Sequence, residues 1–200
     1  MITVRQATGA DVAELSGVLA RAFHDDPPFL WSLPDPQSRP RHLRRVFSTM
    51  LRHEALRHGA TQAACQDGRI VGGALWIPPP RWEDSALRQL LALPGFLRGF
   101  GRRIGYGSAL ATAFAKAHPS EPHWYLSIVG VDPALQGKGV GALLLRSGLD
   151  RCDRQRQPAY LESTKPGNVP LYEHFGFRST GTVELPEGAP EITTMWRPAV

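Results

Sequence analysis

Apolar positions along the chain recur in turn at the period of a strand and at the period of a helix. The strands predicted by this pattern cover residues 2–6, 60–66, 69–77, 123–131, 159–162, 177–183 and 191–196. The predicted helices cover residues 12–23, 38–58, 82–117, 140–155 and 169–175. Because strands alternate with helices and the chain ends in a hairpin-like pair of strands, the pattern predicts an α/β fold with a mixed sheet.

Proline and glycine residues divide these elements. Pro27 and Pro28 end the first helix, because proline cannot continue it, and a loop is expected to follow. The Asp-Gly pair at 67–68 predicts a hairpin turn between two strands. The segment 82–117 contains Pro94, Gly95, Gly99, Gly101, Gly105 and Gly107. So many helix-breaking residues predict two or three short, movable helices instead of one long helix.

The length of 200 residues suits one well-buried core, and no composition break marks a boundary, so a single domain over residues 1–200 is expected. No apolar run reaches the length of a membrane span, and the N-terminus lacks the apolar core of a signal peptide. Cys65 and Cys152 lie far apart and outside any paired motif. We therefore interpret them as buried thiols of a cytoplasmic protein.

The formal charge of +5 comes mainly from arginines, many of which lie in residues 39–57 and 98–103. A nucleic-acid surface is one interpretation, but aromatic residues are not interleaved with these arginines as single-strand binding would need. Solvated helix faces with a few contacts to an anionic cofactor fit the pattern better. We therefore expect no nucleic-acid partner and no membrane partner, and either a monomer or a homodimer.

The most informative segment is the glycine-rich turn VDPALQGKGVG at residues 131–141, between a predicted strand and a predicted helix. Glycine lets the backbone approach an anion closely, and the N–H groups of the first helical turn then point at that anion. The segment therefore predicts a pyrophosphate site. Its spacing matches neither GxxxxGK[ST] nor GxGxxG, which disfavours a nucleotide phosphate loop and a dinucleotide fold.

The turn does match Gln/Arg-x-x-Gly-x-Gly/Ala, and a Val-x-Pro precedes it. This pattern resembles the acetyl-CoA loop of the GNAT superfamily of N-acetyltransferases. The resemblance implies a GNAT fold, with a mixed, mostly antiparallel central sheet of about seven strands flanked by helices, and acetyl-CoA as cosubstrate. The cofactor-binding residues that it implies are Val129, Val131, Gln136, Gly137, Lys138, Gly139, Val140, Gly141 and Asn168.

A second motif supports the same resemblance. Residues 161–177 contain LEST, Asn168, Tyr172 and a Gly-Phe pair, similar to a family motif in which an asparagine contacts the cofactor and a tyrosine approaches the thioester sulfur. Residues 121–197 are also similar to the puromycin N-acetyltransferases, and AFHDDP at 22–27 is similar to small-amine acetyltransferases. The resemblance therefore implies acetylation of a primary amine, with a small molecule as the favoured acceptor.

Acyl transfer from a thioester to an amine makes three demands on such a site. The amine, with a pKa of about 10, must lose a proton to a base; the oxyanion needs preorganised donors; and the thiolate benefits from an acid. The resemblance implies a splayed central strand, on which the backbone N–H of Val129 serves the oxyanion, and it implies Tyr172 as the general acid. Gly130 in that strand is consistent with a bulge or a close backbone approach.

The base stays open between two residues. Some family members carry a glutamate where this strand has Tyr125, so Glu162 on the next strand is the first candidate, directly or through water, and His123 is the second. No metal is expected. His53 and His58 superficially resemble a zinc motif, but their five-residue spacing places them about 140° apart on a helix.

Two other functions stay open. A protein or peptide N-acetyltransferase would share these motifs, and a non-catalytic acyl-CoA-binding module would share the glycine-rich turn. For a small-amine acceptor, the expected pocket combines negative charge, aromatic faces and an adaptable lid over residues 94–107. The residues expected to supply the charge and the aromatic faces are Asp25, Asp26, Phe29 and Trp31.

Overall fold

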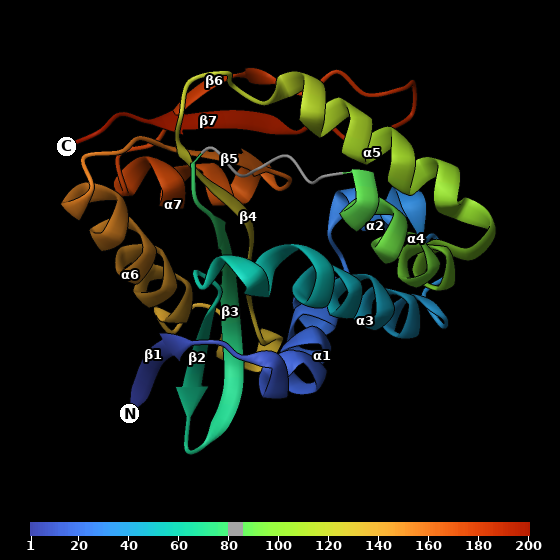
Figure 1. Ribbon diagram of the computed structural model, residues 1–200, viewed down its shortest axis with the longest axis horizontal. Helices are drawn as coiled ribbons and strands as arrows, with labels where there is room; N and C mark the ends of the chain where they lie inside the picture. The colour runs from blue at the N-terminus through green and yellow to red at the C-terminus, as the bar shows by residue number, and fades with distance from the viewer. Residues whose placement is uncertain (80–85) are drawn as a thin grey trace.

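A seven-stranded sheet forms the centre of the computed structural model, which describes residues 1–79 and 86–200 (Figure 1). The strands are β1 (Ile2–Gln6), β2 (Gln62–Gln66), β3 (Arg69–Ile77), β4 (Trp124–Val131), β5 (Ala159–Ser163), β6 (Arg178–Thr182) and β7 (Thr193–Arg197). They lie in the order β1-β2-β3-β4-β5-β7-β6, in which β4 and β5 are parallel and the other neighbours are antiparallel. This confirms the predicted α/β fold with a mixed, mostly antiparallel sheet.

Helices cover both faces of the sheet. The α-helices are α1 (Val12–Ala22), α2 (Pro27–Ser32), α3 (Arg39–Met50), α4 (Ala86–Phe100), α5 (Ile104–Ala117), α6 (Val140–Arg154) and α7 (Val169–His174). A π-helical turn (Leu51–Ala55) and a 3₁₀ turn (Leu56–His58) continue α3 to the end of the predicted 38–58 helix. Figure 1 shows α1 and α3 on one side of β3, α6 on the other, and α4 and α5 beyond α3.

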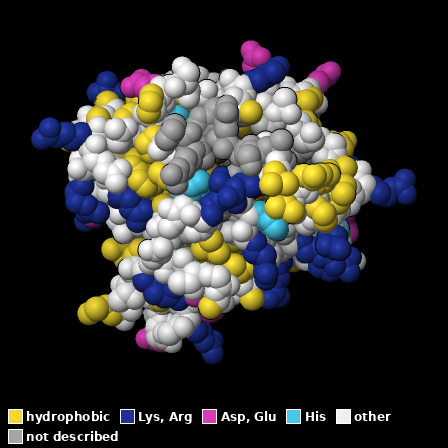
Figure 2. All heavy atoms as spheres, viewed as in Figure 1, with side chains coloured by type: hydrophobic (Ala, Val, Ile, Leu, Met, Phe, Trp, Pro, Cys, Tyr) yellow, Lys and Arg dark blue, Asp and Glu magenta, His cyan; other side chains and the backbone are white. Residues whose placement is uncertain are grey.

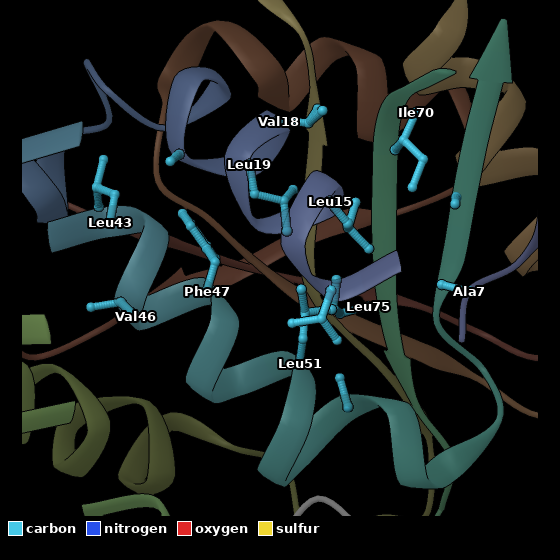
Figure 3. Close-up of a cluster of buried hydrophobic side chains, with 14 of the residues drawn as sticks. Ala7, Leu15, Val18, Leu19, Leu43, Val46, Phe47, Leu51, Ile70 and Leu75 are labelled. Carbon is cyan, nitrogen blue, oxygen red and sulfur yellow. The ribbon is translucent and has the colours of Figure 1, made fainter. Parts of the chain in front are cut away.

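Each face of the sheet has its own apolar core. The first core packs α1 and α3 against the sheet, and its fully buried side chains include Leu15, Leu19, Leu43, Phe47 and Leu75 (Figure 3). The second core packs α6 and α7 against the opposite face, and its members include Trp76, Leu144, Leu149, Tyr172 and Phe177. The sheet is therefore held between two helix layers, and β4 lies at its centre.

The structure differs from the prediction directly after α1. Residues 27–32 form helix α2, where a loop was expected. Pro27 and Pro28 occupy its first turn, and proline is tolerated there because N–H groups of the first turn have no acceptor within the helix. Helix α1 already ends at Ala22 and the proline pair begins α2, which leaves Asp25 and Asp26 in the short connection between the two helices.

The glycine-rich segment forms two helices, but they are longer than expected. Helices α4 and α5 have 15 and 14 residues, with a short turn at Gly101–Arg103 between them, and residues 82–85 of the prediction lie outside the described residues. Gly99 approaches α3 so closely that a Cβ would lie 2.7 Å from Val46 Cγ2. Glycine in α4 therefore serves close helix packing, and it does not interrupt the helix as predicted.

The pairing of β4 with β5 is short. The two strands pair at Trp124–Ala159 and Tyr125–Tyr160, whereas β4 continues along β3 as far as Val131. A register shift between β3 and β4 leaves Ser127 as an extra residue in β4. Residues 127–129 are only half-buried, although they belong to the central strand. The β4–β5 pairing is therefore interrupted beyond Tyr125, and the outer edge of β4 has no strand partner there.

Candidate active site

The glycine-rich turn lies at the C-terminal end of β4 and begins helix α6. Gly137 and Gly139 have φ angles of +75° and +81°, a left-handed conformation that other residues rarely adopt. A Cβ at either position would meet no atom within 4 Å, so the turn borders open space. The first N–H groups of α6 have no acceptor within the helix. This arrangement fits a bound pyrophosphate.

Side-chain hydrogen bonds hold the turn in shape. Gln136 Nε2 donates to the Val131 carbonyl at 3.2 Å, and Lys138 Nζ donates to the Ala134 carbonyl at 3.0 Å. Asp132 accepts from Arg21 Nη2 in α1 at 2.6 Å. The side chains of two predicted cofactor residues therefore stabilise the turn itself, and what the turn offers to an anion is its backbone.

Along β4, the backbone N–H and C=O groups of successive residues point alternately toward β3 and toward β5. The Asp132 N–H donates to the Val71 carbonyl at 2.8 Å, so this is a hydrogen-bonded pair of the β3–β4 ladder. Such pairs alternate along antiparallel strands, so the N–H and C=O groups of Val129 and Val131 face away from β3. They point toward the part of β5 that no longer pairs with β4. The backbone N–H groups of both residues and the Val129 carbonyl are therefore available to a molecule lying between the strands, whereas the Val131 carbonyl already accepts from Gln136 Nε2.

Gly130 approaches a helix closely. A Cβ at this position would lie 2.9 Å from both Leu19 Cδ2 and Phe23 Cε2, so the neighbouring element is the end of α1. The bulge of β4 lies at Ser127 instead. Of the two features that Gly130 suggested, the close approach is present at this residue and the bulge is not.

Tyr172 lies in α7, and its side chain is 7% exposed. Burial raises the pKa of its hydroxyl to about 12, and the negative charge of Asp26 contributes to the shift. Asp26 is 3% exposed and accepts a hydrogen bond from Thr164 Oγ1 at 2.6 Å. Its Oδ1 is buried without a partner among the described residues, and burial raises its pKa to about 6. A buried carboxylate thus lies within electrostatic reach of the predicted acid.

Glu162 in β5 is a second carboxylate of this kind. Burial raises its pKa to about 7, although the hydroxyls of Tyr125 and Tyr160 beside it lower this pKa. Its Oε1 is buried and lacks a partner within the described part of the chain. Strand β5 ends at Ser163 and the chain bends at Thr164, so Thr164 and the Asp26 that it binds lie just past the end of the strand that carries Glu162.

His123, the second candidate base, is buried and not on the surface. Its Nδ1 lies 2.5 Å from the Glu121 carbonyl, and its Nε2 lies 2.9 Å from Nε2 of His118. Burial lowers the pKa of both imidazoles, that of His118 to about 3, so both rings are neutral near pH 7. Because both nitrogens of His123 are already engaged, the geometry favours Glu162 over His123 as the base.

Three of the residues expected to line the acceptor pocket make contacts with other parts of the fold. Asp25 forms an ion pair with Lys165 at 2.7 Å. Phe29 packs into the α1–α3 core, and the ring of Trp31 meets another ring, Tyr106, edge to face. Each of these three residues thus makes a contact that stabilises the fold, and their joint role in an acceptor pocket stays a prediction.

Two site residues were missed at the sequence level, and a third was misread. Thr164 binds Asp26, and the Tyr160 hydroxyl, which donates to the Ala117 carbonyl at 3.4 Å, lowers the pKa of Glu162. Tyr125 was treated as a lost glutamate, but it donates to Glu162. The alternation of Tyr160 and Glu162 in one short strand was a signal for their proximity. The Asp26–Thr164 contact joins residues 138 positions apart, and no local pattern could have predicted it.

The structure also places Asn168, a predicted cofactor residue, and the two cysteines. Asn168 is exposed at the N-cap of α7, on the β5 side of the interrupted pairing. Cys65 is half-buried, Cys152 is buried, and both are free thiols. Within residues 1–79 and 86–200, no group of three or more His, Cys, Asp or Glu side chains could hold a metal ion.

Comparisons with known proteins agree with this geometry. The acetyltransferase (GNAT) family model matches residues 20–177. An uncharacterized N-acetyltransferase of Schizosaccharomyces pombe is 28% identical over 185 residues, which cover 88% of this chain and 74% of the relative. A solved structure from Corynebacterium glutamicum, described as histone acetyltransferase HPA2 and related acetyltransferase, is 31% identical and has a TM-score of 0.78. The match covers 100% of this chain and 97% of that chain.

A more distant structure supports the fold alone. The polyamine N-acetyltransferase of Drosophila melanogaster, which forms N-acetylagmatine, is 18% identical with a TM-score of 0.63, over 99% of this chain and 100% of that chain. The matched family region includes the glycine-rich turn, the interrupted strands and Tyr172. Enzymes of this family use acetyl-CoA as cosubstrate. The chain therefore belongs to the GNAT family of acetyltransferases, and it is an N-acetyltransferase.

Proposed function

We propose that this enzyme transfers the acetyl group of acetyl-CoA to the primary amine of a small molecule, by direct attack of the amine on the thioester. The observation that carries the proposal is the interrupted β4–β5 pairing. It leaves backbone groups of β4 free between an anion-binding turn and two buried carboxylates.

The turn at residues 136–141 would hold the cosubstrate at its pyrophosphate, through backbone N–H groups at the start of α6. The pantetheine arm would then lie along β4 and pair with the backbone N–H and C=O of Val129 and the N–H of Val131. Asn168 would approach from the β5 side. This assignment rests on the backbone conformation of the turn and on the alternation of the β3–β4 ladder.

Two groups would donate to the thioester, one to its carbonyl oxygen and one to its sulfur. The Val129 N–H would donate to the oxyanion that develops when the amine attacks, because a fixed donor there needs no reorganisation. The Tyr172 hydroxyl would donate its proton to the departing thiolate. A pKa of about 12 keeps this hydroxyl protonated at neutral pH, which the role of a general acid requires.

Glu162 is the proposed base. A carboxylate with a pKa of about 7 is largely ionised at slightly alkaline pH and is a much better proton acceptor than an exposed glutamate. A hydrogen bond from Tyr125 would orient it. Asp26 would attract the cationic amine toward Tyr172, since its Oδ1 has no other partner among the described residues.

A small acceptor is favoured by the placement of these carboxylates. Asp26 and the oxygen Oε1 of Glu162 are buried, so a short amine reaches them more easily than a side chain of a folded protein. The resemblance of residues 121–197 to the puromycin N-acetyltransferases points the same way. A peptide acceptor is the alternative, and the description of the Corynebacterium structure as a histone acetyltransferase favours it.

A competition assay decides between the two acceptor classes. With saturating acetyl-CoA, we expect kcat/KM for at least one small primary amine to exceed that for lysine-containing peptides by about tenfold or more. Release of free thiol reports turnover. Peptides with kcat/KM above every amine would establish the alternative, and thiol release from neither class would favour a binding module.

The turn can be tested by placing a negative charge in it. Gly139→Asp forces a strained φ angle and puts a carboxylate beside the pyrophosphate, so acetyl-CoA affinity should fall at least about tenfold, measured by calorimetry. Gly188→Asp is the matched control, because Gly188 has a φ of +79° and also faces open space. Equal affinities for the two variants would remove the turn from the binding site.

The acid can be tested by removing one oxygen atom. Tyr172→Phe keeps the ring in the core but deletes the hydroxyl, so kcat should fall by about 10²–10⁴-fold while acetyl-CoA affinity stays nearly constant. Tyr106→Phe, at the other end of the molecule, should leave kcat unchanged. If Tyr172→Phe retained full kcat, the hydroxyl would have no part in catalysis.

The base can be tested through the pH profile of kcat. A base must be deprotonated to act. The value of kcat should therefore be low in acid and rise with pH through an apparent pKa of about 7. Glu162→Gln should remove this limb and lower kcat by about 10²-fold or more. A limb that persisted near pH 7 in the variant would assign it to another group, and Asp26→Asn would then be the next variant to measure.

A further inference from the structure

Helix α4 turns its leucines toward solvent. Leu87, Leu90 and Leu91 are 66%, 63% and 58% exposed, and Leu93 and Leu97 are 43% and 45% exposed. These five residues are called the leucine face. Figure 2 shows a contiguous hydrophobic patch at the position that α4 occupies in Figure 1. A soluble monomer rarely exposes an apolar surface of this kind without a use for it.

The inner face of α4 explains why the leucines point outward. Ala92 is 2% exposed, and the helix meets α3 through small residues. A Cβ on Gly99 would lie 2.7 Å from Val46 Cγ2, and one on Gly95 would collide with Thr49. The two helix backbones therefore lie close together. Rotating α4 to bury its leucines would replace these small residues with large ones, for which no space exists against α3.

The three helices around the leucine face carry cationic side chains and no carboxylates, although Glu83 and Asp84 precede α4 in the sequence. Residues 39–50 and 86–117, which contain α3, α4 and α5, include no Asp and no Glu. The exposed cations of these segments are Arg41, Arg44, Arg45, Arg88, Arg98, Arg102 and Lys116. Arg45 Nη1 also donates to the Arg98 carbonyl at 3.2 Å, which ties α3 to α4. In Figure 2, Lys and Arg side chains surround the hydrophobic patch.

We propose that the leucine face of α4 binds the surface of an anionic lipid bilayer. Leucines inserted at the interface, with arginines beside them on lipid phosphates, are the combination that holds a helix in the plane of a membrane. No helix of the described residues is long and apolar enough to cross a membrane. The proposed contact is peripheral, and it departs from the expectation of no membrane partner.

Charge and composition argue against two other occupants. A second copy bound through the same face would place Arg98 and Arg102 near their own equivalents, because a two-fold interface joins identical patches. Single-stranded nucleic acid needs exposed aromatic rings for stacking, but Phe96 is half-buried and Phe100 is buried. The exposed ring of Tyr106 already contacts Trp31 and Arg103. An anionic bilayer satisfies both the aliphatic side chains and the cations.

The test is flotation of the full chain with lipid vesicles. Vesicles of phosphatidylcholine with about a quarter phosphatidylglycerol should bind the protein at least about tenfold more strongly than pure phosphatidylcholine, and added salt should weaken the binding. Leu90→Gln combined with Leu91→Gln should reduce binding to the anionic vesicles at least about tenfold. Leu143→Gln, which changes a leucine of α6 that is 42% exposed, is the matched control and should bind like the unmodified chain.

A charge variant provides a second, independent measurement. Arg98→Gln combined with Arg102→Gln should lower anionic binding and reduce its salt dependence, whereas Arg178→Gln on β6 should not. Circular dichroism verifies that each variant is folded. Equal binding to neutral and anionic vesicles would overturn the proposal, and so would full binding by the double-leucine variant. Concentration-dependent dimerisation that the leucine variant abolishes, without vesicle binding, would assign the face to a second copy instead.

Discussion

Strands β4 and β5 pair through two residues each and then separate, and the rest of the site depends on this separation. In a complete sheet, each backbone N–H and C=O of a central strand is used by a neighbouring strand. Here the groups of Val129 and Val131 that face away from β3 have lost that neighbour. The fold thus leaves hydrogen-bonding capacity at its centre, beside the turn that begins α6, where an extended ligand can satisfy it.

Helix α1 and the connection that follows it contact both sides of the gap between β4 and β5. The connection between α1 and α2 reaches the segment after β5 through Asp26–Thr164 and Asp25–Lys165. The end of α1 packs directly on Gly130 of β4. Helix α1 therefore touches β4 while the chain that follows it holds the β5 side. Asp26 is buried in this bridge, which is why its carboxylate has so little solvent around it.

The proposed acid–base chemistry depends on burial of ionisable side chains in low-dielectric surroundings. Burial disfavours the charged form of Asp26, Glu162 and Tyr172, and the pKa of each is raised. A carboxylate becomes a stronger proton acceptor, and a tyrosine remains a reliable donor. The His118–His123 pair illustrates the opposite outcome, because burial there keeps two rings neutral and engaged with each other. A single physical effect thus separates candidate acid and base from structural histidines.

The sequence by itself determined the features that depend on local chemistry. The glycines of the 136–141 turn, the apolar periods of the strands and helices, and the position of Tyr172 four residues before Gly176 were sufficient for the family and for most of the element order. Only the tertiary structure decided the partner of Asp26 and the direction of the α4 leucines. The first depends on a contact across 138 positions, and the second on glycines that fit α3. Periodicity locates an apolar face on a helix, but the shape of the neighbouring helix decides whether that face is buried.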